Sequence, residues 1–434
     1  MQLKKFKLSK LFGRIDHEID FPVSEGDSSE PSLVILHGPN GIGKTTILKM
    51  IDGIMRLDFT VFRQTPFSRC SLQFSNNKSI DVRSNGGHSS RTLEVAFDGK
   101  VAKLNVKRAG PATHEDAAAV DGLRTDFFAQ TNRIKFEFIN TNRTGAASRD
   151  ATERYRELAD EMRSIEARIV DDAEIEQSAS RDSAVLARSK IIARRKFGST
   201  ATTLARFIAE AQINYRNFFS TSTPDLFPKI LQRLGEQSSL RYTSEDLLAR
   251  LRSISERDGY TQRLGLQGDR WNYDQLAQLL TPKSSENTNS NALAVVGTYV
   301  EFLESRAAER ALVAERLLTF EKLASELLHE KKVTVEPEVG FRIETRDGQV
   351  LVEEQLSSGE LHLLYLMVSA LTTRRRGTVI AIDEPELSMH IAWQRRLVRT
   401  LFQCASKAEP QFILATHSPD IAAEYPESMI DLAG

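Results

Sequence analysis

The sequence has little cysteine and no long apolar run, and each shortage narrows what the chain can be. Among 434 residues, Cys70 and Cys404 are the only cysteines, and they stand far apart without metal-ligand spacing. This pattern suits a reducing compartment and argues against a zinc site. No stretch approaches the roughly 20 apolar residues that a membrane span needs, and the basic N-terminus, MQLKKFKLSK, lacks the apolar core of a secretory signal. We therefore expect a cytoplasmic protein that does not contact membranes.

Net charge is also nearly absent, because 58 Lys and Arg residues face 59 Asp and Glu residues. No global positive field draws such a chain onto nucleic acid, so any contact with DNA must come from a local patch. The candidate patch consists of Arg188, Lys190, Arg194, Arg195 and Lys196. A solvated helix face explains the same residues at least as well. The length predicts two or three compact domains.

The N-terminal part reads as β structure around one helix. Residues 2–22 predict a hairpin, residues 33–36 a buried strand, and residues 42–56 a helix with apolar residues at helical spacing. Residues 60–107 alternate short β-favouring runs with turns rich in Asn, Gly and Asp. This pattern indicates an antiparallel sheet.

The middle of the chain favours helices. Apolar residues recur every three or four positions at 155–169 and again at 313–327, so the two segments predict either a short antiparallel arm or two ordinary packed amphipathic helices. Further helices are expected at 204–219 and 244–254, and the polar stretch 284–291 reads as a loop.

The β pattern returns after the helical middle. From residue 333 onward, short β-favouring runs reappear. Asp347 and Gly348 stand between two of them and predict a hairpin turn. The remaining motifs of the chain follow this hairpin.

A glycine-rich loop, HGPNGIGKTT, follows the apolar run at 33–36 directly. Its core, Gly38-x-x-x-x-Gly43-Lys44-Thr45, fits the P-loop pattern. In such a loop glycines let backbone N–H groups close round a β-phosphate, while the lysine neutralises the β and γ oxygens and the hydroxyl ligates Mg²⁺. The strand before the loop and the helix after it make an ordinary glycine turn a poor explanation.

Two further apolar strands end in polar residues. The run TVIAI leads into Asp383 and Glu384, of which the first would hold a metal, usually through water, and the second would deprotonate an attacking water. An exposed acidic turn would not need five apolar residues before it. The run FILA leads into Thr416 and His417, where an imidazole can sense a γ-phosphate. A lone histidine more often makes a structural hydrogen bond, but its position one strand after the acidic pair favours function.

A serine-rich segment, LSSGE at 356–360, precedes the helical run at 361–371. Its hydroxyls, free backbone N–H groups and the positive end of a helix dipole together form an anion site. Taken alone, the same residues are simply a good helix N-cap.

The segments GPNGIGKTT, LSSGE, VIAIDEPELSMH and ATHSPDI, in this order, resemble Walker A, signature motif, Walker B with D-loop, and H-loop of an ABC-class ATPase. Within that class the motif sequences are similar to those of the branch that contains RecF, the SMC proteins and the ATPase half of OLD-family nucleases. The resemblance implies an α/β fold: an ABC-type P-loop head with a mixed sheet and an antiparallel β subdomain, interrupted by a helical or short coiled-coil insertion. We expect lobe I at 1–143, the insertion at 144–332 and lobe II at 333–434.

The resemblance also implies ATP and Mg²⁺ as ligands and assigns residues to them. The nucleotide-binding residues would be Gly38, Asn40, Gly41, Gly43, Lys44, Thr45, Thr46, Ser357, Ser358, Gly359 and Glu360; the Mg²⁺ residues Thr45, Asp383 and Asn142; and the catalytic residues Lys44, Glu384 and His417. The signature residues would contact the γ-phosphate of ATP held by a second subunit. Since each chain has one P-loop and one signature motif, a homodimer or larger even assembly is implied.

The sequence departs from the family pattern at two places. His362 stands where a glutamine is common after the signature motif. No clean glutamine loop is visible, and Gln130 and Asn142 are both candidates for it. We favour Asn142 because the surrounding sequence, residues 138–143, resembles the corresponding strand of related ATPases. Arg143 could face a phosphate or form a structural salt bridge.

Function must be argued from what accompanies the ATPase. The sequence has no acidic Toprim cluster after His417 and no HNH-like pattern of His and Cys, so we expect that the chain itself cuts nothing. In this it resembles the ATPase subunits of anti-phage systems of the PARIS and Septu types, which restrain a separate Toprim or HNH nuclease. The resemblance implies an ATP-dependent sensor and scaffold. The rival hypothesis is a RecF-like clamp that closes on DNA; a structural protein with a degenerate site is disfavoured because each catalytic position holds a competent residue.

Overall fold

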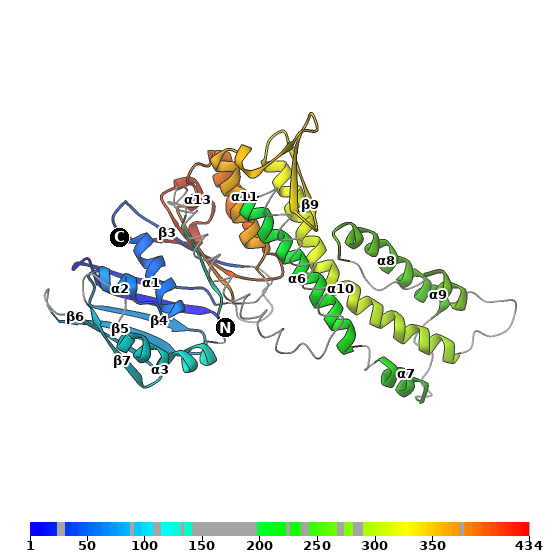
Figure 1. Cartoon of the computed structure of the whole chain (residues 1–434), viewed down its shortest axis with the longest axis horizontal. Helices are drawn as coiled ribbons and strands as arrows, with labels where there is room; N and C mark the ends of the chain where they lie inside the picture. Colours follow the sequence, from blue (N-terminus) through cyan, green and yellow to red (C-terminus); the bar gives the residue numbers. More distant parts are fainter. Residues whose placement is uncertain are drawn as a thin grey trace. The chain divides into compact units, whose positions relative to one another are not determined.

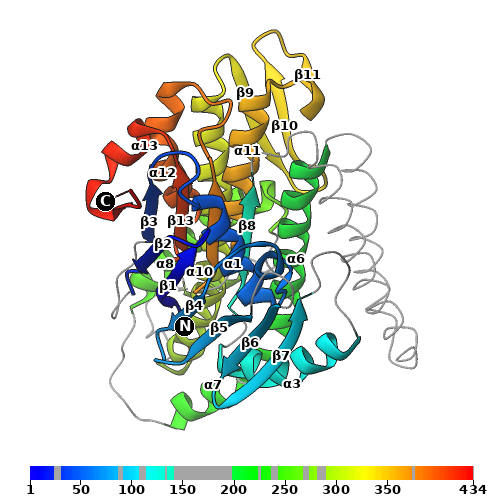
Figure 2. The ribbon, with the colours of Figure 1, turned by 90° about the vertical axis from the view of Figure 1, so that its left-hand side faces the viewer.

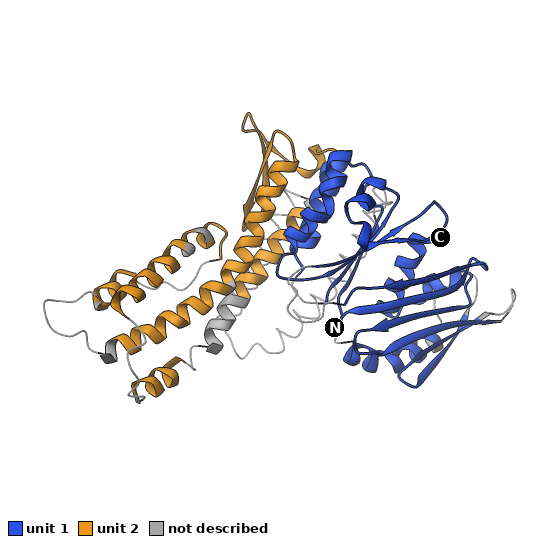
Figure 3. Cartoon of the chain, turned by 180° about the vertical axis from the view of Figure 1, so that it is seen from behind, with its two compact units in different colours: residues 1–171, 358–434 blue, residues 172–357 orange. Residues whose placement is uncertain are grey.

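The computed structural model describes residues 1–23, 31–86, 91–106, 114–131, 134–140, 198–222, 226–235, 243–266, 273–280, 290–373 and 377–433. The chain forms two compact units, residues 1–171 with 358–434 and residues 172–357, which are coloured blue and orange in Figure 3. The lobe limits expected at 143 and 332 stay a prediction. Across the described ranges, no helix combines the length and apolar character that crossing a bilayer requires.

The first unit contains a five-stranded sheet in the order β14-β3-β13-β12-β8, and every adjacent pair in it is parallel. Strand β3 is labelled in Figure 1, and β3, β13 and β8 are labelled in Figure 2. Its strands are β3 (Ser32–His37), β8 (Phe136–Asn140), β12 (Val379–Asp383), β13 (Gln411–Thr416) and β14 (Met429–Asp431). Every residue of β12 and β13 is buried, as expected for strands covered on both faces. Because the strands are parallel, their carboxyl ends meet at one edge of the sheet.

Helices of the first unit follow the strands closely. Among them are α1 (Lys44–Arg56), α2 (Thr60–Gln64), α11 (Ser358–Leu371), α12 (Ile391–Cys404) and α13 (Pro419–Glu424), with a 3₁₀ turn, η4, at Pro426–Ser428. The predicted helix after the P-loop is confirmed, and its apolar stripe is buried at Ile47, Leu48, Ile51 and Ile54. Helix α1 therefore begins at the P-loop lysine and is anchored by its apolar face.

A six-stranded antiparallel sheet completes the first unit, in the order β2-β1-β4-β5-β6-β7. Its strands are β1 (Leu3–Leu11), β2 (Ile15–Asp20), β4 (Arg69–Phe74), β5 (Ser79–Gly86), β6 (Arg91–Phe97) and β7 (Lys100–Val106). The helix α3 (His114–Gln130) packs on this sheet, and the Phe127 ring lies 6.0 Å from Phe74 and 5.2 Å from Phe97 between ring centroids. The predicted hairpin and antiparallel sheet are thus confirmed.

A buried glutamine joins the parallel sheet to the first strand of the antiparallel sheet. The Gln411 side chain accepts a hydrogen bond from Leu3 N at 2.7 Å and donates to Leu3 O at 3.0 Å and Pro22 O at 3.3 Å. Gln411 is only 2% exposed. Its amide thus provides hydrogen-bond partners for backbone groups of Leu3 and Pro22.

The second unit is mainly helical. Its elements are α6 (Gly198–Ser222), α7 (Leu226–Gly235), α8 (Ser244–Arg263), α9 (Tyr273–Leu280) and α10 (Ser290–Leu327), then β9 (Lys331–Glu336), β10 (Gly340–Thr345), β11 (Val350–Leu351) and the 3₁₀ turn η3 (Glu353–Gln355). The expected helices at 204–219, 244–254 and 313–327 lie within α6, α8 and α10, and the hairpin around Gly348 is β10–β11.

Several predicted features of the helical middle lie outside the described residues. These are the segment 155–169, the basic patch between Arg188 and Lys196, and most of the polar stretch 284–291, whose last two residues open α10. The antiparallel arm therefore stays a prediction. Asn142, at the end of the expected lobe I, also lies outside the described residues.

A buried carboxyl fastens η3 to the beginning of α6. Glu353 accepts hydrogen bonds from Ala201 N at 2.8 Å and Thr200 N at 3.5 Å, and it is 7% exposed. Burial raises the pKa of Glu353 to about 7, although the two backbone bonds act in the opposite direction. Glu353 lies four residues before Ser357, so it anchors the segment that leads into the signature motif.

Candidate nucleotide-binding and catalytic site

The P-loop runs from the end of β3 to the first turn of α1, as its sequence predicts. Three of its glycines have positive φ angles: Gly38 at 152°, Gly41 at 84° and Gly43 at 104°. At Gly43 a Cβ atom would also collide with the Leu11 side chain. The loop conformation therefore requires glycine, and it leaves the N-terminus of a helix facing the loop, a ready site for an anion.

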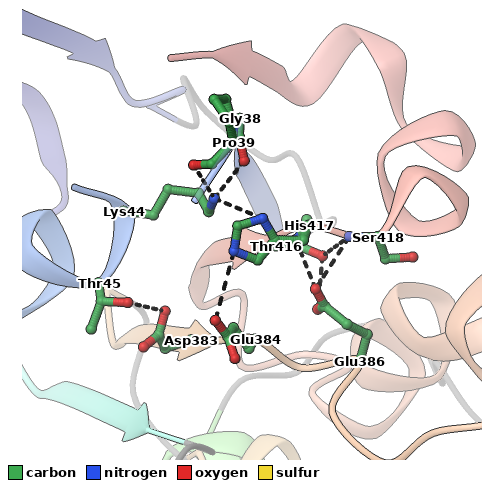
Figure 4. A network of polar contacts seen from close by, with 10 residues as sticks. All are labelled: Gly38, Pro39, Lys44, Thr45, Asp383, Glu384, Glu386, Thr416, His417 and Ser418. Atoms are coloured by element: carbon green, nitrogen blue, oxygen red, sulfur yellow. Dashed lines mark hydrogen bonds and ion pairs between the residues drawn. The ribbon is translucent and has the colours of Figure 1, made fainter. Parts of the chain in front are cut away.

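Lys44 is buried and its ammonium group points back into the loop (Figure 4). Its Nζ donates to Gly38 O at 2.5 Å and Pro39 O at 3.2 Å, and lies 3.1 Å from Nδ1 of His417. Burial lowers the pKa of Lys44, while the carboxylate of Glu384 acts in the opposite direction. The cation thus lies where the phosphates of a nucleotide would meet the loop.

His417 lies between the P-loop lysine and an acid. Because an ammonium group can only donate, Nδ1 of His417 accepts from Lys44, and the proton of a neutral ring then sits on Nε2. That nitrogen lies 3.7 Å from Oε1 of Glu384. The structure therefore brings together the three residues predicted to be catalytic, Lys44, Glu384 and His417 (Figure 4).

Asp383 and Thr45 meet at the carboxyl end of β12. The Thr45 hydroxyl donates to Oδ1 of Asp383 at 3.0 Å, and Asp383 is 1% exposed. Burial raises the pKa of Asp383 to about 6, against the effect of the Thr45 hydrogen bond. A hydroxyl and a carboxylate oxygen at this spacing are the hard ligands that Mg²⁺ prefers, so the donor set fits the expected ion.

Glu384 has a left-handed backbone conformation, with φ of +51°. Its N–H still donates to Ala415 O of β13, at 2.7 Å, so the strand ladder continues up to the residue that bends away. A left-handed conformation at a non-glycine residue costs on the order of 1 kcal/mol or more and is typical of functional sites. The bend carries the Glu384 carboxylate towards His417.

A third acid, Glu386, was not singled out from the sequence. Its carboxylate accepts hydrogen bonds from the Thr416 hydroxyl at 2.7 Å, from His417 N at 2.7 Å and from Ser418 N at 3.2 Å (Figure 4). The signal available in the sequence was the third acid of the segment DEPE. Only the fold shows that it reaches a strand end 30 residues away.

Asn140 is a second residue that sequence analysis did not select. It ends β8 directly beside Asp383 in the register of the parallel sheet. The preferred candidate for the glutamine loop, Asn142, lies outside the described residues. The alternative, Gln130, donates to Asp98 Oδ2 at 2.5 Å, and Asp98 follows strand β6 of the antiparallel sheet.

The signature segment leads into α11, which begins at Ser358. Ser357 and Ser358 are exposed, Glu360 is half-buried, and Gly359 is buried where a Cβ atom would collide with the carbonyl oxygen of Ser388. His362, the departure from the family pattern, lies one turn further along.

The ring of His362 contacts the segment that follows the acidic pair. Its Nδ1 lies 3.1 Å from Leu387 O and must donate, because a carbonyl oxygen can only accept. This bond and the close approach at Gly359 fix the beginning of α11 against residues 387–388.

The remaining nucleotide-binding candidates lie in and around the P-loop. Asn40 and Gly41 are exposed at its tip, and Thr46 is half-buried in the first turn of α1. Phe12, at the tip of the β1–β2 hairpin, is 45% exposed, and its Cε2 lies 3.7 Å from the position of a Cβ on Gly43. An exposed aromatic ring therefore borders the loop.

A family model described as "AAA domain, putative AbiEii toxin, Type IV TA system" matches residues 33–423, which is most of the sequence and includes all four motifs. The chain belongs to this AAA-domain family. This membership, with the P-loop geometry above, supports the P-loop ATPase class that the motifs predicted. No curated protein matches the chain significantly.

Solved structures similar to this member of the AAA-domain family include heads of SMC proteins. One is the Smc head domain of Pyrococcus furiosus with an extended coiled coil bound to the C-terminal domain of ScpA, with 13% identity and a TM-score of 0.37 over 98% of this chain and 91% of that one. Another is the SMC head domain from Thermotoga maritima, with 12% identity and a TM-score of 0.33 over 98% of this chain and 92% of that one. Scores this low carry no argument about function.

Proposed function

We propose that this chain binds MgATP and hydrolyses it to ADP and phosphate. The observation that carries the proposal is the chain of contacts from Lys44 through His417 to Glu384, beside the pair of Thr45 and Asp383. These residues come from the P-loop and from the ends of two strands, β12 and β13. Family membership supports the same reading.

Each side chain has a task that its position allows. Lys44 would bind the β and γ phosphate oxygens in place of the loop carbonyls that it now contacts. Glu384 would orient the attacking water and take its proton, and His417 would hold that water near the γ-phosphate. Thr45 and Asp383, with Asn140 beside them, would hold the Mg²⁺, which neutralises phosphate charge when bound.

The signature residues support a shared site. Ser357 and Ser358 are exposed at the beginning of α11, where the positive end of the helix dipole favours an anion. We propose that they contact the γ-phosphate held by the P-loop of a second copy, so that two chains form a symmetric dimer with two composite sites.

The biological role that we propose is that of a sensor and scaffold in an anti-phage system, whose nucleotide state decides whether a separate effector nuclease of the Toprim or HNH type is held or released. The description of the family as a "Type IV TA system" supports a role in a system with more than one component. The alternative, a RecF-like clamp on DNA, depends on a basic patch at 188–196 that lies outside the described residues.

The first experiment measures ATP hydrolysis and light-scattering mass for the wild type, Lys44→Ala and Glu384→Gln. We expect Lys44→Ala to lose nucleotide binding. Glu384→Gln should keep binding and lose about 100- to 10,000-fold in kcat, because the general base is gone. With MgATP it should also accumulate as a dimer, since hydrolysis no longer opens the assembly.

The two outcomes that matter are distinct. Wild-type turnover in Glu384→Gln would remove this residue as the base. Adding the products of adjacent genes to the trapped dimer tests the biological role: capture of a nuclease supports the scaffold, whereas retention of duplex DNA at physiological salt, without a protein partner, supports the clamp.

A further inference from the structure

The carboxylate of Glu386 gathers three donors at the point where β13 ends (Figure 4). Oε2 accepts from the Thr416 hydroxyl, and Oε1 accepts from the backbone N–H groups of His417 and Ser418. Thr416 is fully buried and Ser418 is 6% exposed, so this carboxylate contacts the inner side of the turn. Hydrogen bonds to an ionised acceptor are about twice as strong as neutral ones.

The hydrogen bonds to Glu386 begin where the backbone pairing of β13 with β3 ends. The ladder between β13 and β3 ends at the pair of Thr416 and His37. The next amide N–H, that of His417, is bound by Glu386 instead of by a strand. Ser418 then caps α13 by accepting from Ile421 N at 3.2 Å, so the turn is held at both ends.

The turn carries His417, whose side chain points towards the proposed catalytic residues Lys44 and Glu384. The imidazole of His417 lies 3.1 Å from Lys44 Nζ and 3.7 Å from Glu384 Oε1. Its backbone is held by a residue only two positions after Glu384 in the chain. A displacement of about 1 Å at such a group can cost about 100-fold in rate.

We propose that Glu386 is the positioning residue of this site: it accepts three hydrogen bonds from residues 416–418 and thereby holds the His417 imidazole between Lys44 and Glu384. It couples the turn after β12 to the turn after β13, so that a movement of one is passed to the other.

The substitutions Glu386→Gln and Glu386→Ala separate geometry from charge. Glutamine can still accept both backbone N–H groups through Oε1 while its amide nitrogen donates to the Thr416 oxygen, so the turn stays in place without the negative charge. Alanine removes all three bonds. Thr416→Val keeps the shape of the side chain and removes the bond to Glu386, together with the bond that the hydroxyl accepts from Ser418 N at 2.9 Å. Glu427→Ala, at an exposed position, is the matched control.

We expect Glu386→Ala to lower kcat by about 10- to 100-fold while the Kd for a non-hydrolysable ATP analogue stays within about twofold, and Glu386→Gln to recover most of the loss. Thr416→Val should fall between them. Unchanged kcat in Glu386→Ala and Thr416→Val would overturn the proposal, and so would an equal loss in the glutamine and alanine variants, which would assign the effect to charge. If the alanine variant does not fold, the glutamine and valine variants decide between these outcomes.

Because kinetic readouts presuppose the proposed ATPase function, a second measurement uses the nucleotide-free protein. The ¹H–¹³Cε1 NMR signal of His417, assigned by its loss in His417→Gln, reports on the surroundings of the ring whether or not ATP is hydrolysed. We expect the signal to move in Glu386→Ala and to stay near its wild-type position in Glu386→Gln and Glu427→Ala. A signal that stays in place in Glu386→Ala would overturn the positioning role, whereas a moved signal without any ATPase activity in the wild type would overturn only the proposed function.

Discussion

The hydroxyl of Thr45 donates a 3.0 Å hydrogen bond to the carboxylate of Asp383, although 338 positions separate the two residues in the chain. One belongs to the first turn of α1 and the other ends β12. The bond brings the Thr45 and Asp383 oxygens together in the site. In the sequence, Thr45 directly follows Lys44, and Asp383 directly precedes Glu384.

This pair predicts a simple substitution series at Thr45. Thr45→Val removes the hydroxyl and keeps the shape of the side chain, so we expect the Mg²⁺ concentration for half-maximal ATP hydrolysis to rise by about tenfold or more. Thr45→Ser keeps the hydroxyl and should stay near the wild type. Hydrolysis is measured against Mg²⁺ at fixed ATP, and a valine variant with the wild-type Mg²⁺ dependence would remove Thr45 from the proposed metal site.

The shared site predicts complementation between two inactive variants. Ser358→Arg blocks the exposed end of α11 and should abolish hydrolysis without unfolding the chain, because Ser358 makes little contact with the core. Lys44→Ala inactivates the P-loop. In a mixture, each heterodimer has one intact P-loop that faces an intact signature segment, so random pairing should restore about a quarter of wild-type turnover. Turnover is measured in equimolar mixtures, and a mixture as inactive as its two components contradicts the composite site.

The buried amide of Gln411 predicts a stability defect at a position without catalytic function. Gln411→Ala leaves Leu3 N, Leu3 O and Pro22 O without these bonds, so we expect the free energy of unfolding to fall by about 2–3 kcal/mol. The urea midpoint measures the change, and Gln403→Ala, at an exposed position of α12, is the control. Equal midpoints for the two variants would show that Gln411 does not hold the sheets together.

The raised pKa of Glu353, about 7 in place of 4.5, predicts how stability depends on pH. Well below pH 4.5 the Glu353 carboxyl is protonated in both the folded and the unfolded chain, and its contribution to the free energy of unfolding is fully present. Between these two values the unfolded chain ionises while the folded chain keeps its proton, so the contribution falls as pH rises, by about 3 kcal/mol at pH values above 7.

Glu353→Gln should remove this dependence, since an amide does not titrate. Urea midpoints of the wild type and the variant at several pH values between 4 and 8 measure it. Glu354→Gln, at the exposed neighbouring position, should keep the wild-type slope. Parallel curves for the wild type and Glu353→Gln would mean that Glu353 does not titrate as its burial requires.

Much of the site could be predicted because its motifs are local. The P-loop needs glycines at fixed spacing between a strand and a helix, and the acids of β12 follow five buried positions, so both are visible in short windows of sequence. The fold class, a P-loop α/β head with an antiparallel β subdomain and a helical region, could also be predicted from short windows of sequence, and it is confirmed.

The contacts that sequence analysis did not find are long-range ones. Glu386 reaches Thr416 and Gln411 reaches Leu3, and neither partner can be read from its own neighbourhood. Likewise, Asn140 and Asn142 differ by only two positions, and it is the strand register that places Asn140 beside Asp383. Pairing between distant strands depends on the whole hydrophobic pattern and not on a motif.

The strand order also determines when the strands of the parallel sheet can pair during translation. Strand β3 lies between β14 and β13, and β8 pairs with β12, so both early strands need partners from residues 379–431. While the ribosome is still producing residues 172–357, β3 has neither neighbour, and an apolar strand with two bare edges invites aggregation. A nascent chain therefore has to keep β3 from other chains until the ribosome has added residues 411–431, which contain its two neighbours β13 and β14, and we expect chaperones that shield apolar strands to bind the chain during this time.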